Sequence, residues 1–103
     1  MEFDHIGVPA AAKRDGMRFL ESKRLWLTSP GDHPYRVEWL WYEPDSPESA
    51  LIRTTPHVAY RVARLEDAMV GQTVIAEPFD VFGEVRVSFI EVDGAAVEFV
   101  ESY

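Results

Sequence analysis

Cysteine is absent from this 103-residue chain, which excludes disulfide bonds, thiolate zinc sites and cysteine nucleophiles. Any metal would therefore have to be held by imidazole and carboxylate groups. No apolar run is long enough to span a bilayer, and the acidic start MEFDHIGV lacks the basic-then-apolar layout of a signal peptide. We therefore expect a cytoplasmic protein with no membrane partner.

Basic residues are scarce relative to acidic ones. The 10 Lys and Arg residues against 18 Asp and Glu give a net charge of −8, which repels phosphate backbones, so we expect no nucleic-acid partner. There is also no glycine-rich phosphate loop and no serine nucleophile motif. Hydrophobic residues make up 47% of the chain, which fits a single domain over 1–103 with a modest core.

One short order of predicted elements, a strand with a histidine followed by a helix, occurs twice along the chain. The segments FDHIGV (3–8) and HVAYRV (57–62) are each typical of a strand that carries a histidine, and a helix is expected after each, over 11–23 and in LEDAMVGQ. Further strands are predicted in LWLTS, YRVEWLWYE, TVIAEPFDV and the hairpin EVRVSFIEV-DG-AAVEFVE. We predict an α+β fold of tandem βαβββ-type modules, with a first module over 1–47, a connector over 48–56 and a second module over 57–103.

Four polar residues interrupt the apolar strands, two in each half: His5, Glu38, His57 and Glu98. The tripeptides VEW (37–39) and VEF (97–99) carry their glutamates alike. Strand alternation puts each glutamate on the face opposite its bulky neighbours, and it puts His57 opposite Val58 and Tyr60, which we expect to face the core. The first His–Glu pair is about eight residues closer in sequence than the second, so the first module is expected to be shortened by about one strand.

If the two modules pair around a pseudo-twofold axis, these four side chains converge in one cleft. Two imidazoles and two carboxylates suit a divalent Zn, Ni, Co, Mn or Fe ion and leave room for a chelating small-molecule substrate. Each residue taken alone is more often a hydrogen-bonded strand histidine or a solvent-facing glutamate. Their recurrence at matching places in both halves favours a shared site.

The segments FDHIGV, VEWLWYEPDSP, HVAYRVARLEDAM and VSFIEVDGAAVEFVE resemble the vicinal oxygen chelate superfamily, which includes glyoxalase I, methylmalonyl-CoA epimerase, extradiol dioxygenases and bleomycin-resistance proteins. The resemblance implies a curved mixed sheet around a cleft and a homodimer. It also places the metal ligands at His5, Glu38, His57 and Glu98.

In this superfamily the metal binds two neighbouring substrate oxygens, and a carboxylate can remove the proton beside a carbonyl. Two histidines with two glutamates resemble the glyoxalase and epimerase branches. The resemblance thus implies a metal-dependent lyase or isomerase acting on a small oxygenated carbonyl compound, with Glu38 or Glu98 as the base. Two alternatives stay open: a non-catalytic ligand-binding module of the resistance type, and a structural or regulatory partner that uses the open sheet.

The remaining candidates carry weaker signals. The tryptophans at 26, 39 and 41 are expected in the core or at a dimer face. Tyr42, Arg61 and Arg86 are candidates for binding an anionic substrate, and His33 lies in a turn sequence, where we expect no role.

Overall fold

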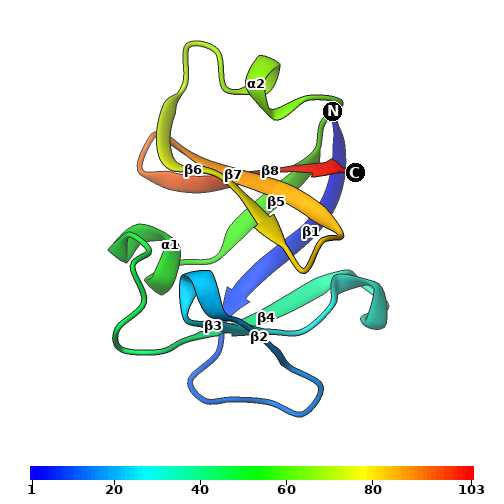
Figure 1. The fold of residues 1–103 in the computed structure, drawn as a ribbon, viewed down its shortest axis with the longest axis vertical. Coiled ribbons are helices and arrows are strands. Elements are labelled where there is room, and N and C mark those ends of the chain that lie inside the picture. Colours follow the sequence, from blue (N-terminus) through cyan, green and yellow to red (C-terminus); the bar gives the residue numbers. More distant parts are fainter.

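A computed structural model describes residues 1–103, whose eight strands form one mixed sheet (Figure 1). The strands lie in the order β2-β3-β4-β1-β5-β8-β7-β6. Their bounds are β1 Glu2–Pro9, β2 Arg18–Leu20, β3 Leu25–Leu27, β4 Val37–Tyr42, β5 His57–Arg61, β6 Thr73–Val81, β7 Val85–Val92 and β8 Ala95–Ser102. Two short helices, α1 (Ala50–Thr54) and α2 (Leu65–Ala68), complete the fold, and neither is long and apolar enough to cross a membrane.

The sheet repeats one arrangement about its centre. Strand β1 runs parallel to β4, and β5 runs parallel to β8. The two central strands, β1 and β5, pair antiparallel and lie side by side through the middle of the curled sheet (Figure 1). The outer strands of each half form antiparallel pairs. This arrangement confirms the predicted α+β fold of tandem modules with a shortened first copy.

The helix predicted over 11–23 is wrong. Residues 18–20 form β2, which pairs with β3, and a 3-10 turn over Glu21–Lys23 joins the two strands. Strand pairing wins because it buries Leu20 in one cluster with apolar residues of β3 and β4. Gly16, at φ +83°, also departs from a helical path. The expected loss of a strand is wrong too, since both halves have four strands and the first lacks its helix instead.

The main core lies on the inner face of the curled sheet. Ala59 of β5 is fully buried there, beside Ile52 of α1 and Val100 of β8. We expected Val58 and Tyr60 to take the more buried side of β5, but these two side chains are only half-buried. The expectation fails because the curl closes the sheet around its inner face, while α2 alone covers the outer face of the second half.

A loop takes the place of the missing helix on the outer face of the first half. The ammonium of Lys13 lies 4.1 Å from the ring centre of Trp26, and the guanidinium of Arg14 lies 3.7 Å from that of Trp39. Trp26 pairs across the sheet with Trp41. The three tryptophans thus form a half-buried outer layer that cationic side chains cover.

Candidate metal centre

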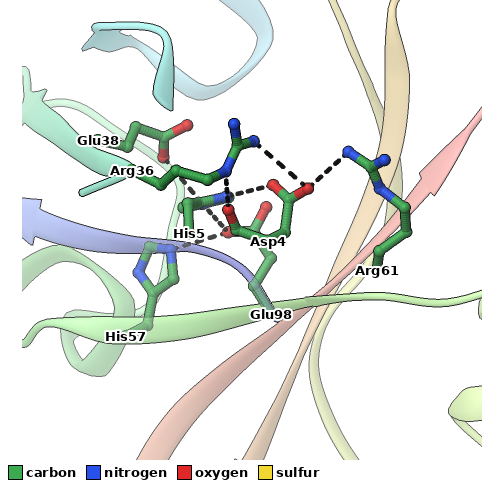
Figure 2. A network of polar contacts seen from close by, with 7 residues as sticks. All are labelled: Asp4, His5, Arg36, Glu38, His57, Arg61 and Glu98. Carbon is green, nitrogen blue, oxygen red and sulfur yellow. Dashed lines mark hydrogen bonds and ion pairs between the residues drawn. The ribbon is translucent and has the colours of Figure 1, made fainter. Parts of the chain in front are cut away.

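The structure brings the four predicted polar residues to one buried centre on the inner face (Figure 2). Each comes from a different strand, and one ligand atom from each lies within 4.8 Å of all the others. The set is His5 of β1, Glu38 of β4, His57 of β5 and Glu98 of β8. Residues up to 93 positions apart in sequence therefore meet at one point.

Strand register explains the convergence. Gly7 pairs with both Glu38 and His57, and Ala59 pairs with both Glu98 and His5. Each small residue follows its own histidine by two positions, in HIG and HVA, so each lies beside the histidine of the other central strand. The repeated pattern of histidine, one residue, then a small residue is a sequence signal that our reasoning missed.

Gly7 has no room for a side chain. A Cβ built on Gly7 would lie 2.2 Å from Cε1 of the His57 imidazole. The same imidazole packs edge-to-face with the ring of Phe89, with ring centres 4.9 Å apart. These two contacts fix the plane of the His57 ring.

Glu98 is the centre of the hydrogen-bonding pattern. Its Oε1 lies 2.8 Å from Nε2 of His57 and 3.2 Å from Nε2 of His5. Glu38 is held less tightly, with 3.4 Å between its Oε1 and Nε2 of His5. Both imidazoles thus point the same nitrogen at one carboxylate oxygen (Figure 2).

Burial and charge separate the pKa values of these groups. Burial lowers the pKa of His5, but hydrogen bonds to Asp4, Glu38 and Glu98 outweigh it and raise the pKa to about 12. Burial raises the pKa of Glu98, but hydrogen bonds from the two imidazoles outweigh it and lower the pKa to about 2. Burial raises the pKa of Glu38, and the nearby His5 offsets this only in part.

Asp4 reaches the site through a break in strand alternation. The β1–β5 register shifts between Phe3 and His5, so Asp4 sits at a bulge and is buried beside its neighbour. His5 Nδ1 donates a hydrogen bond of 2.7 Å to Oδ2 of Asp4. The hydrogen bond from His5, together with Arg61, lowers the pKa of Asp4 against the effect of burial. Sequence reasoning missed this role because simple alternation puts Asp4 on the opposite face.

The donor set fits a divalent metal ion. Atoms bound to one ion at about 2.1 Å lie about 3 Å apart when adjacent and about 4 Å apart when opposite. The contacts of 2.8, 3.2 and 3.4 Å between the imidazole and carboxylate atoms match this spacing. The bond from His5 Nδ1 to Asp4 also leaves Nε2 as the nitrogen that faces the centre. The cluster could therefore hold a metal.

Solved structures of other proteins match this architecture over nearly the whole chain. A hypothetical protein from Bacillus halodurans C-125 is 22% identical, with a TM-score of 0.66 and 99% of this chain and 94% of that chain covered. A methylmalonyl-CoA epimerase from Mycobacterium tuberculosis is 18% identical, with a TM-score of 0.60 and coverage of 99% and 88%. The chain has the vicinal oxygen chelate fold. No protein-family model and no curated protein matches the sequence.

The vicinal oxygen chelate fold of this chain carries a pocket of about 230 Å³ beside the four-residue centre. His5, Glu38 and Glu98 line the pocket. A second cavity of about 30 Å³ lies on the side of His57 and Tyr42 and is lined mainly by apolar residues. Glu38 and Glu98 line both cavities, whereas His5 lines only the larger one and His57 only the smaller one.

Of the weaker candidates from the sequence, only Arg61 lines the larger pocket. Arg86 pairs with Glu66 and Glu101 elsewhere on the sheet. Tyr42 is half-buried on the inner face, and burial, followed by the charge of Glu48, raises its pKa. His33 lies in a turn away from the larger pocket.

Proposed function

We propose that this chain is a metal-dependent enzyme of the glyoxalase and epimerase type, with lyase or isomerase chemistry on a small oxygenated carbonyl compound. The observation that carries the proposal is the meeting of His5, Glu38, His57 and Glu98 within 4.8 Å of one another. Matching strands of two repeated halves supply these groups, and the adjoining pocket can admit a small molecule. The fold shared with a solved methylmalonyl-CoA epimerase supports it.

A divalent ion held by these residues would supply a positive charge that stabilises negative charge developing on substrate oxygens. Glu98 acts as a fixed ligand because its Oε1 contacts both imidazoles. His5 is oriented by Asp4, and His57 by its packing on Gly7 and Phe89. The chain thus holds three ligating groups in place without help from the substrate.

Glu38 is the better candidate for the base. Its single contact with the cluster is the longest of the three, and its side chain lines the larger pocket. A carboxylate that is loosely held beside the substrate can take a proton from the carbon next to a carbonyl and return it. The raised pKa of Glu38 is consistent with this task, because a base works best near the operating pH.

Metal analysis of the purified protein tests the metal centre. We expect about one equivalent of divalent metal in the wild type and little in His57→Ala, because removing a ligand leaves an incomplete set. His33→Ala is the matched control, since His33 lies in a turn outside the site. Equal and negligible metal in all three proteins would contradict the proposal.

Proton exchange tests catalysis separately from metal binding. The metal-loaded protein is incubated in deuterated water with pyruvate or hydroxyacetone, and loss of the protons beside the carbonyl is followed by NMR. We expect exchange in the wild type, loss of exchange with retained metal in Glu38→Gln, and no change in the exposed control Glu91→Gln. Metal binding without exchange of any probe would favour a non-catalytic ligand-binding module.

A further inference from the structure

Two arginines flank the larger pocket at the point where it meets the metal centre. Arg36 directly precedes β4, and Arg61 ends β5. Both line the same pocket as His5 and Glu38. Figure 2 shows their guanidinium groups on either side of the Asp4 carboxylate, next to the four-residue cluster.

The two arginines carry more positive charge than their partner neutralises. Arg61 donates a hydrogen bond of 2.7 Å to Oδ1 of Asp4. The Nε of Arg36 donates a hydrogen bond to the backbone oxygen of Asp4. A terminal nitrogen of Arg36 lies 3.7 Å from the same Oδ1. Two guanidinium groups therefore share one carboxylate that also accepts a hydrogen bond from His5. Most of their N–H donors have no hydrogen-bond acceptor within the chain.

These donors are accessible and held in place. The side chains of Arg36 and Arg61 are 42% and 52% exposed, whereas that of Asp4 is 8% exposed. Arg36 adopts a left-handed φ of 57°, which residues other than glycine seldom adopt, and its carbonyl accepts a hydrogen bond from the backbone of Ile6. A forked, anchored pair of this kind suits a carboxylate or phosphate group.

Arginines are concentrated at this pocket. The chain carries −8 overall, with 10 basic residues, yet three arginines gather at this pocket: Arg18, Arg36 and Arg61. Arg18 is already paired with Glu84 at 2.7 Å. Four carboxylates line the same pocket: Asp4, Glu38, Glu84 and Glu98. Glu84 is paired with Arg18, and Glu38 and Glu98 would face the metal, so only Asp4 is left to offset Arg36 and Arg61. The metal-loaded pocket therefore attracts an anion beside these two arginines.

We propose that Arg36 and Arg61 form an oxyanion subsite, so that the substrate is a small organic acid with two recognised ends. One end carries the neighbouring oxygens that chelate the metal, and the other carries a second carboxylate or phosphate that the two arginines bind. This inference rests on the proposed function, because it assumes that the chelating end meets a metal at the four-residue centre.

Paired probes test the subsite on the metal-loaded protein by calorimetric titration. Pyruvate is compared with 2-oxoglutarate, and glycerate with 3-phosphoglycerate, so that each pair differs mainly by a second carboxylate or a phosphate. In at least one pair, we expect the member with the second anionic group to bind about tenfold more tightly or better. The pair that shows the preference identifies which oxyanion the arginines take.

Variants assign the preference to the arginines. Arg61→Gln and Arg36→Gln should each reduce the ratio of the two affinities within a pair toward one. The ratio is compared within each metal-loaded variant, because both arginines also contact Asp4 and can change the affinity for pyruvate or glycerate itself. Arg61→Lys should retain part of the preference, because the charge remains. Arg86→Gln is the matched control, since Arg86 lies outside the pocket, and it should leave the preference intact.

The outcomes separate the two proposals. Equal affinities within both pairs in a protein that binds metal would overturn the subsite and leave the metal centre standing. A preference that survives the loss of both arginines would also overturn the subsite. Failure of the wild type to take up metal would instead overturn the proposed function, and the subsite with it.

Discussion

At the scale of single residues, two small side chains make the centre possible. Gly7 and Ala59 lie across the sheet from the histidines of the opposite half, so each imidazole occupies space that a larger residue would fill. At Gly7, an added Cβ would meet three atoms of the His57 ring at 2.2 to 2.8 Å. A small residue at this position therefore decides where a ligand points.

The first prediction follows from this crowding. Gly7→Ala should push the His57 ring out of line, weaken metal binding at least tenfold and lower the free energy of unfolding by about 1–3 kcal/mol. Gly31→Ala is the matched control, because a Cβ there meets nothing within 4 Å. Chelator competition and urea denaturation measure both quantities, and equal values for the two variants would contradict the account.

The second prediction concerns pH and His5. Hydrogen bonds to Asp4, Glu38 and Glu98 outweigh burial and raise the pKa of His5 to about 12 in the metal-free protein. The imidazole is therefore protonated at neutral pH, and a metal must displace that proton. Metal affinity should rise with pH between 6 and 8, by about tenfold per unit for one displaced proton. Chelator competition at several pH values checks this, and a flat profile would contradict it.

At the scale of elements, a bulge in β1 allows two adjacent residues, Asp4 and His5, to be buried together. It turns Asp4 toward the inner face beside His5, where the two adjacent residues form a hydrogen bond of 2.7 Å. A carboxylate that accepts the outer nitrogen of a ligating histidine fixes the orientation of its ring. The bulge therefore belongs to the site as much as the ligands do.

The third prediction tests the role of Asp4. Asp4→Ala should weaken metal binding by about 10- to 100-fold, since His5 loses its orienting partner. Asp4→Asn should recover part of the affinity, because the amide oxygen can still accept the hydrogen bond. The exposed Asp15→Ala serves as the control. If Asp4→Ala and Asp15→Ala bind metal alike, Asp4 has no orienting role.

The loop before β2 replaces a helix as the cover of the outer face. Arg14 lies over Trp39, at 3.7 Å from the ring centre, and Lys13 lies over Trp26. The fourth prediction is that Arg14→Gln lowers the free energy of unfolding by about 1 kcal/mol and changes tryptophan fluorescence. Arg64→Gln, on an exposed side chain near α2, should do neither. An unchanged Arg14→Gln protein would show that the contact between Arg14 and Trp39 contributes no stability.

At the scale of the whole molecule, the duplication was readable from sequence and the details were not. The repeated histidine strands and the VEW and VEF tripeptides predicted two modules and a meeting of four side chains. Local signals failed over 11–23, where burial of Leu20 in a strand pair outweighed the helical pattern. Arg36 and Asp4 were missed because a positive φ and a bulge position them. The homodimer stays a prediction.

The central claim is that the two halves hold one divalent metal between His5, Glu38, His57 and Glu98. Anomalous diffraction from crystals grown with Mn²⁺ or Zn²⁺ tests it most directly. The account predicts one strong peak within about 2.0–2.3 Å of Nε2 of both histidines and of a carboxylate oxygen of Glu98. Crystals with no peak at this centre, or with metal only on surface carboxylates, would contradict it.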